Sequence, residues 1–408
     1  MKKKLISAVL AAALACSLAA TPALADVIIV DTATAETAES AEVAETVSAI
    51  DWADLEAEIR ENSLSGQIIA ESISGIEAVN YDDMAENLRD QLNALATAEW
   101  YMLEYGLDAT TVANTYDTLR ETFDDLMDGK IQENYEDAAW QLRDSANQLV
   151  AAGQTLYITL LSLEQSAADV ERGIATIDRS LTELNLRHSL GQISAQTVTS
   201  VEQTRATTVS LLQTLNATIS TYKAQLQTLI GAEPTGDLTL GALPTDDTTD
   251  WSAIDYEADL AAAKAVSWTL RDADVTLDDA AEAWDDAQDD YRVNSINEYL
   301  RVQAEHTWNA AQITWQSAYQ SFETSFKALY DALADCEQVY QNKLETLEYQ
   351  KTLLATAETQ YSYSAASLNS VRDAEDSVAS AESDVYSAWL DLFSARLAYQ
   401  NAVQYGIV

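Results

Sequence analysis

The sequence predicts an all-α protein made of long antiparallel coiled-coil helical hairpins in two tandem repeats. The chain of 408 residues contains only three prolines, and Pro234 and Pro244 lie ten residues apart in one short segment. Because a proline costs about 3 kcal/mol inside a helix, the proline-free stretches on either side can form long uninterrupted helices. Apolar residues in these stretches recur at the spacing of coiled coils. These two observations define the fold class.

Two segments show the coiled-coil spacing most clearly. Apolar residues alternately three and four positions apart keep one seam of a helix against a partner helix. Small residues alternate with large ones in the second of these seams, which allows a close approach of the helices. The first seam consists of Leu212, Leu215, Ile219, Tyr222, Leu226 and Leu229, and the second of Val378, Ala381, Val385, Ala388, Leu392, Ala395, Tyr399 and Ala402.

The first 25 residues have the layout of a secretory signal peptide. Three lysines at positions 2–4 precede an apolar run at 5–20, and residues 23–25 form a small-x-small cleavage site. A lipid anchor at Cys16 is the alternative. No later segment has the roughly 20 apolar residues that a membrane helix needs. We therefore expect an exported protein.

Two further segments set the domain boundaries. Residues 26–50 form a low-complexity Ala/Thr/Glu/Val tract, predicted to be a disordered leader because it has too little apolar surface to offset the entropy of ordering. Residues 232–250 contain Pro234, Pro244 and two glycines, and are predicted to be a linker. The linker separates a first helical half, 51–231, from a second half, 251–408.

Each half is predicted to follow one plan: a helix, a break, a very long helix, a turn and a final helix. The expected helices of the first half lie near 51–63, 80–105, 109–128, 132–188 and 194–230. In the second half they lie near 254–291, from about 296 to 361, and from about 368 to 405. Gly231 and Gly406 each follow a final helix, and forty residues earlier lie Gly191 and Ala366. This shared spacing suggests an old duplication, with Gly191 and Ala366 at the hairpin turns.

The formal net charge of −45 limits the possible partners. Such a surface repels nucleic acid and anionic lipid headgroups, so we expect no nucleic acid partner. It would attract cations and basic proteins. The simpler interpretation is that the acidic residues keep a long helical surface soluble.

The sequence contains no pattern of catalytic, cofactor-binding or metal-binding residues. His188 and His306 are far apart, and there is no HExxH, Cys-x-x-Cys, P-loop or dinucleotide-binding motif. We therefore expect neither an enzyme nor a cofactor protein. An acidic stripe on the predicted helix 254–291 is interpreted as a solvated face, with weak divalent-cation binding as the alternative; its members are Asp278, Asp279, Glu282, Asp285, Asp286, Asp289 and Asp290.

Several segments around the turns and the final helices carry a family resemblance. In the first half they are Leu190-Gly191-Gln192-Ile193-Ser194 with Val198 and Val201, then 224–231 (AQLQTLIG); in the second half they are Ala374-Glu375, 395–399 (ARLAY) and Tyr405-Gly406. With the order of the helices, these residues resemble the TolC family of outer membrane efflux proteins over residues 108–408. The resemblance implies a homotrimer whose helices enclose a tunnel, serving as an efflux conduit of the cell envelope. It also implies a membrane-fusion adaptor and an inner-membrane transporter as partners.

The resemblance further implies acidic residues that line the tunnel tip shortly after the second turn. In the family these residues lie six and nine positions after the turn glycine. The same two spacings from Ala366 give Arg372 and Glu375, and spacings one residue longer give Asp373 and Asp376. The candidate tip residues are therefore Asp373, Glu375 and Asp376.

One departure from the family is large. The family has paired β-strands of an outer membrane barrel between the first and second helices of each half. A membrane strand needs about 9–11 residues, whereas the breaks near Gly129 and Asn294 offer only a few. The predicted fold is therefore TolC-like without a substantial β-barrel. The alternative function is a secreted coiled-coil structural or interaction protein, a spacer or scaffold with no conduit.

Overall fold

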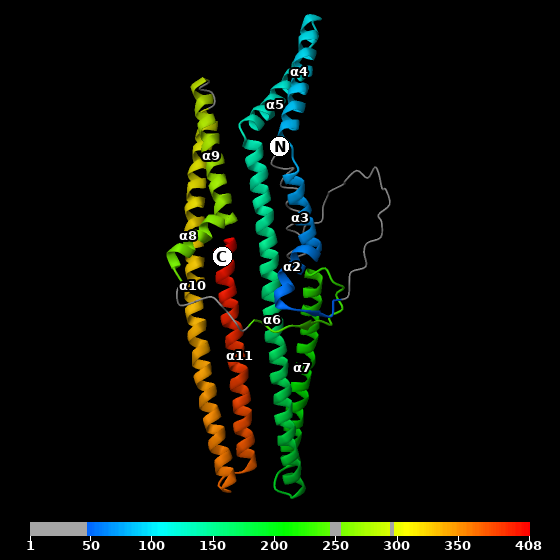
Figure 1. Ribbon diagram of the computed structural model, residues 1–408, viewed down its shortest axis with the longest axis vertical. Coiled ribbons are helices and arrows are strands. Elements are labelled where there is room, and N and C mark those ends of the chain that lie inside the picture. The colour runs from blue at the N-terminus through cyan, green and yellow to red at the C-terminus, as the bar shows by residue number, and fades with distance from the viewer. Residues whose placement is uncertain (1–46, 245–253, 294–297) are drawn as a thin grey trace. The chain divides into compact units, whose positions relative to one another are not determined.

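The computed structural model describes residues 47–244, 254–293 and 298–408 (Figure 1). The predicted signal peptide at 1–25 and most of the predicted leader lie outside the described residues. Residues 64–149 form one compact unit, and the described residues of 47–63 and 150–408 form another. The two units do not coincide with the predicted halves, because the boundary falls inside one long helix. Each unit is described by itself.

The first unit contains α3 (Leu64–Glu77), α4 (Tyr81–Glu104), α5 (Thr110–Met127) and the beginning of α6 (Lys130–Ser189). The side chain of Asn80 begins α4 by accepting hydrogen bonds from the amides of Asp82 (3.1 Å) and Asp83 (3.2 Å). α4 and α5 pack as an antiparallel hairpin, in which the Arg89 guanidinium lies 5.8 Å from the centre of the Phe123 ring (Figure 1). The helices predicted at 80–105 and 109–128 are confirmed. α3 was not predicted, because its serines and glycines are poor helix formers.

The second unit is organised around two long hairpins. One consists of α6 beyond Leu149 and α7 (Ala195–Leu229), and the other of α10 (Glu298–Ser362) and α11 (Leu368–Tyr405). Ion pairs join the partners within each hairpin, Lys223 with Glu164 at 2.7 Å and Arg396 with Glu337 at 3.0 Å. The turns of both hairpins lie at the same end of this unit (Figure 1). The predicted all-α class of long antiparallel hairpins is confirmed.

Burial confirms both coiled-coil seams. Every residue of the two predicted seams is partly or fully buried, whereas Leu211, directly beside the first seam, is 56% exposed. The spacing of apolar residues therefore identified the inward face of α7 and of α11 correctly.

Each half has a kink that the sequence analysis did not predict. α2 (Trp52–Asn62) is separated from α3 by Ser63, and α8 (Tyr256–Val266) from α9 (Trp268–Val293) by Ser267. Both serines have extended backbones, with φ/ψ of −68/139° and −74/118°. The prediction of one helix over 254–291 is therefore wrong at Ser267. The cause is tertiary, because the main chain of Ser267 packs directly against Gly406.

A short strand pair corrects two predicted boundaries. β1 (Ala49–Ile50) pairs in parallel with β2 (Thr239–Leu240), so residues 47–50 of the predicted leader and 232–244 of the predicted linker have a defined structure. This structure has a physical cause. Ile50, Leu238 and Leu243 are buried, and the Tyr157 hydroxyl donates a 2.8 Å hydrogen bond to the carbonyl of Gly241.

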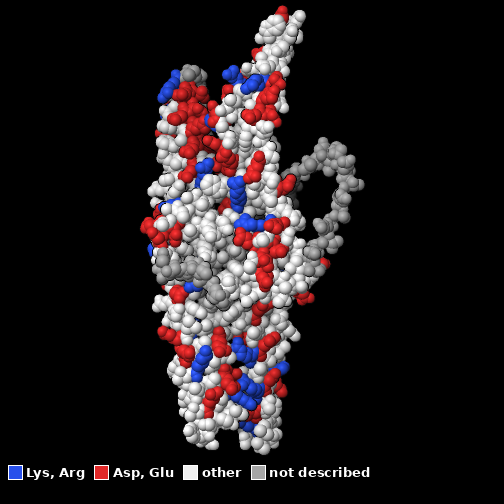
Figure 2. All heavy atoms as spheres, in the orientation of Figure 1, with Lys and Arg blue, Asp and Glu red and all other residues white. Residues whose placement is uncertain are grey.

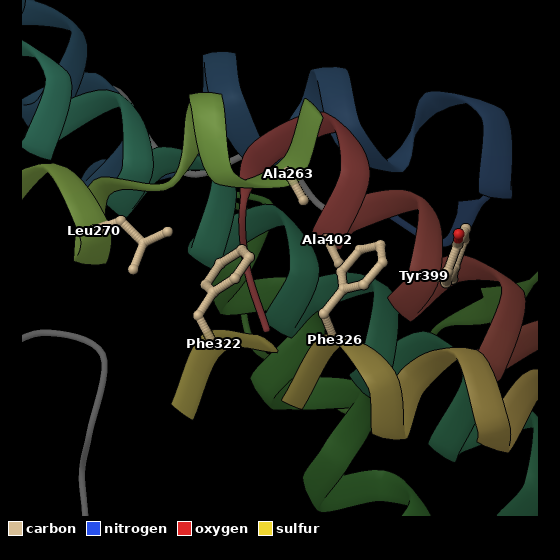
Figure 3. Packing of buried hydrophobic residues seen from close by; sticks show 6 residues of the cluster. All are labelled: Ala263, Leu270, Phe322, Phe326, Tyr399 and Ala402. Atoms are coloured by element: carbon tan, nitrogen blue, oxygen red, sulfur yellow. The ribbon is translucent and has the colours of Figure 1, made fainter. Parts of the chain in front are cut away.

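Four helices of the second half meet in one hydrophobic cluster (Figure 3). Phe326 of α10 is fully buried there, and its ring centre lies 5.4 Å from that of Tyr399 on α11 and 5.7 Å from that of Tyr256 on α8. The hydroxyl of Tyr399 donates a 2.8 Å hydrogen bond to Asp259, which satisfies its polar atom within the cluster. The buried members are Ala263, Leu270, Phe322, Phe326, Tyr399 and Ala402.

Acidic side chains are distributed unevenly over the surface. Acidic side chains gather over the end of α9 that is remote from the hairpin turns (Figure 2). All seven residues of the predicted acidic stripe are exposed, in agreement with a solvated face. Among the described residues, no helix is both long enough and apolar enough to cross a bilayer.

Candidate functional site at the hairpin turns

The two hairpin turns of the second unit have the same backbone conformation. In the first turn, the amides of Gly191 and Gln192 donate to the carbonyls of His188 and Arg187, both at 2.9 Å. In the second turn, the amides of Ser364 and Ala365 make the corresponding bonds to Tyr361 (2.9 Å) and Gln360 (2.8 Å). These bonds satisfy carbonyl groups at the ends of α6 and α10.

The turn residues correspond in a different register from the one predicted. Gly191 has φ +70°, and the residue with this left-handed backbone in the second turn is Ser364, with φ +58°. Ala366 does lie in the turn, but its counterpart is Ile193 and not Gly191. The forty-residue count was misleading because Gly231 follows Gly191 by 40 residues, whereas Gly406 follows Ser364 by 42.

Serine side chains begin both outgoing helices. Ser194 accepts a hydrogen bond from the amide of Thr197 (3.3 Å), and Ser367 from the amide of Ser370 (3.2 Å). Each serine follows the left-handed residue by three positions, so both turns bring the chain into the next helix in the same way.

Polar contacts connect the two hairpins close to the turns. The carboxylate of Asp376 on α11 accepts hydrogen bonds from the Arg179 guanidinium and from the Thr176 hydroxyl (3.2 Å) on α6. Nearer to the turns, the Asn369 amide donates to Glu183 at 3.1 Å. These contacts form an inter-hairpin clamp between α6 and α11.

The clamp continues away from the turns. Gln165 of α6 donates a 2.9 Å hydrogen bond to the Ser383 hydroxyl of α11, and this hydroxyl donates in turn to Asp169. Farther along, Asn401 donates to Gln154 at 3.2 Å. Ser383 and Asn401 are buried, so their hydrogen bonds are made away from solvent.

A separate ion pair joins α6 to α7. Arg205 donates to both carboxylate oxygens of Asp178, at 2.5 and 3.1 Å. These hydrogen bonds, with the positive charge of Arg205, lower the pKa of Asp178, and the same pair raises the pKa of Arg205. Two consecutive residues of α6, Asp178 and Arg179, therefore serve different contacts, one within the hairpin and one between the hairpins.

The three candidate acidic residues have different surroundings. Asp373 and Glu375 are exposed, and Arg372 beside them is also exposed. Asp376 is partly buried because it belongs to the clamp. The clamp residues of α6 were not predicted; they are Thr176, Arg179 and Glu183. They lie three and four positions apart on one face of α6, but their spacing does not identify α11 as the partner, and their contacts depend on how α6 is rotated against α11.

Possible metal ligands are dispersed over the part of the chain that the structure describes. No group of three or more His, Cys, Asp and Glu side chains there is placed to hold a metal ion. The ring of His188 contacts the carbonyl of Ile193 (3.1 Å) in the first turn, and His306 is exposed on α10. The rings of Trp284 and Trp308 stack between α9 and α10 with centres 4.7 Å apart, which is a packing contact.

Comparison with known proteins gives matches in structure but not in sequence. No family model matches the chain, and no curated protein matches it. The open state of the Neisseria gonorrhoeae MtrE outer membrane channel matches with a TM-score of 0.56 and 13% identity, over 90% of this chain and 94% of that one. A membrane protein from Pseudomonas aeruginosa matches with a TM-score of 0.56 and 11% identity, over 92% and 97% of the chains. The Campylobacter jejuni CmeC outer membrane channel matches with a TM-score of 0.54 and 8% identity, over 71% and 68%.

Proposed function

Because the chain has the fold of the TolC-family outer membrane channels, we propose that it is a subunit of an export conduit in the cell envelope. The conduit is a homotrimer that works with a membrane-fusion adaptor and an inner-membrane transporter. The chain acts by enclosing a passage and not by catalysis. The observation that carries this proposal is the pair of long hairpins, held together by the inter-hairpin clamp, with their turns at one end of the unit.

The geometry of one chain supports assembly from several copies. One chain contributes two hairpins, α6–α7 and α10–α11, which is too few helices to enclose a passage of useful width. Homo-oligomers with cyclic symmetry close such rings from identical copies, and each copy then places its turns at the same end. A chain with net charge −45 would line such a passage with carboxylates unless other groups shield them.

The exposed acids after the second turn give the proposed conduit its tip chemistry. Asp373 and Glu375 are exposed, so three copies would form rings of carboxylates near the turns. Rings of acidic side chains concentrate cations in a pore. Asp376 has another role in this proposal, because its ion pair with Arg179 holds α11 against α6.

We expect the mature chain to be a trimer with a central channel. Native mass spectrometry should give three times the monomer mass, and negative-stain images viewed end-on should show a stain-filled centre. A strict monomer, or an oligomer with a solid centre, would contradict the conduit. Either result would favour the secreted coiled-coil spacer.

The proposed carboxylate ring predicts an effect on cation block. In a conductance assay of the reconstituted assembly, Asp373→Asn together with Glu375→Gln should weaken block by divalent cations about tenfold or more. The matched control is Glu382→Gln, because Glu382 is also an exposed acid of α11 but lies farther from the turn. An unchanged block in the double variant would remove both residues from the tip.

A further inference from the structure

The end of the α4–α5 hairpin exposes a dense group of large apolar side chains. Five of the eight residues at 100–107, which we call the apolar tip, are between 51% and 74% exposed: Trp100, Tyr101, Leu103, Tyr105 and Leu107. The end of this hairpin carries few charged side chains (Figure 2). Soluble proteins rarely leave apolar side chains gathered in this way, and such patches mark interaction surfaces.

The apolar side chains cover a wide arc at the end of the helix and continue into the turn, so they do not form a narrow stripe along α4. Successive residues of a helix point about 100° apart. Trp100, Tyr101 and Leu103 are therefore spread over a wide arc around α4, while Tyr105 and Leu107 follow at the turn. A partner helix or a groove on another protein would require one apolar stripe. A helix end with exposed apolar side chains over a wide arc, interrupted by the single carboxylate of Glu104, fits shallow immersion in an apolar medium.

The length of the apolar tip fits a membrane interface. Earlier exposed positions of α4 are polar residues or alanines, among them Asp90, Asn93 and Ala96, and large exposed apolar side chains begin at Trp100. The six residues from 100 to 105 extend roughly 9 Å along the helix axis. Interfacial helices bury their apolar side chains about 5–10 Å deep. The tip is therefore long enough to enter the interfacial layer and too short to cross the hydrocarbon core.

We propose that the apolar tip inserts end-on into the interfacial layer of an electrically neutral lipid bilayer. Tryptophan and tyrosine rings are the side chains that concentrate in this layer. The tip has eight residues, whereas a stable protein partner would need about 20–30 residues on each side. The other described parts of this hairpin have no comparable exposed apolar group.

Charge decides which bilayer the tip can enter. No lysine or arginine lies between Arg89 and Arg120, so anionic headgroups have no partner on this part of the hairpin. Glu104 is an exposed carboxylate within the tip, and Asp108 directly follows the tip. Asp108 accepts hydrogen bonds from the Thr110 amide (3.0 Å) and hydroxyl (2.5 Å), which lower its pKa and keep it ionised at the start of α5. These charges limit the depth of insertion and disfavour anionic lipid.

The test is flotation of the mature chain with neutral phosphatidylcholine vesicles. Wild-type protein should float, and Trp100→Ser with Tyr105→Ser should lower the partition coefficient about tenfold or more. The matched control is Tyr299→Ser with Ile313→Ser on α10, because these side chains are also highly exposed, at 66% and 69%. The control should float like the wild type. Helical circular dichroism of all three proteins checks that they are folded.

Several outcomes would overturn the proposal. They are no flotation of the wild type, equal loss of flotation in the control, and stronger flotation on vesicles with anionic lipid. A tip variant that changes the oligomeric mass without vesicles would instead assign the tip to a second copy of the chain. As an independent readout, brominated phosphatidylcholine should quench tryptophan emission in the wild type more than in Trp100→Phe. This inference does not depend on the proposed conduit, since it concerns the first unit alone.

Discussion

Phe326→Ala should lower the free energy of unfolding by about 3–5 kcal/mol. Phe326 is 0% exposed, and its ring lies between Tyr256 and Tyr399 in the cluster that joins α8, α9, α10 and α11. Truncation removes the buried ring and leaves a cavity among helices that cannot all close over it. Loss of the two aromatic contacts adds to the cost.

Urea unfolding followed by circular dichroism measures this effect as a shift of the transition midpoint. Ile313→Ala on the same helix is the control, because Ile313 is 69% exposed and its truncation should change stability by no more than about 0.5 kcal/mol. Equal shifts in the two variants would mean that the cluster at Phe326 does not hold the four helices together.

Gly406→Ala should destabilise the protein by about 3 kcal/mol or more, through two separate effects. Gly406 has φ +68°, a left-handed backbone that costs a non-glycine residue roughly 1–2 kcal/mol. A Cβ at this position would also lie 2.4 Å from the Cα and 2.6 Å from the amide nitrogen of Ser267. These are main-chain atoms of the α8–α9 kink, so they cannot move aside as a flexible side chain could, and overpacking of this kind costs about 1–3 kcal/mol more.

Gly191→Ala separates the two effects. Gly191 has almost the same φ, +70°, but a Cβ there would meet nothing within 4 Å. This control should therefore show only the backbone cost. Thermal unfolding of both variants gives the comparison, and equal losses would mean that the C-terminal segment does not pack against Ser267.

The periodic features of the structure could be predicted from the sequence. The apolar spacing in α7 and α11 identified the buried seams, and the absence of proline identified α6 and α10 as very long helices. These predictions succeeded because a buried face repeats with the period of the helix, whatever partner covers it. The positions of the two hairpin turns were likewise predictable from short polar breaks between such stretches.

Aperiodic features could not be predicted. The Ser63 and Ser267 kinks lack proline, and Ser364 adopts a left-handed backbone that serine rarely takes. Counting residues therefore paired Gly191 with Ala366, two positions after its structural counterpart Ser364, although the turn itself lies where it was predicted. The strand pair β1–β2 was missed for a related reason: it consists of two residues in each strand, too few for any alternation to be visible.

The sequence by itself determined the all-α class, the two long hairpins and the inward faces of their helices, because these follow from local spacing along one helix. Only the tertiary structure decided which polar residues meet. The pairing of Asp376 with Arg179, which leaves Asp373 and Glu375 exposed, depends on the rotation and the offset of α11 against α6. The rotation and the offset are set by the packing of side chains from distant segments. They therefore cannot be predicted from the residue spacing within one helix.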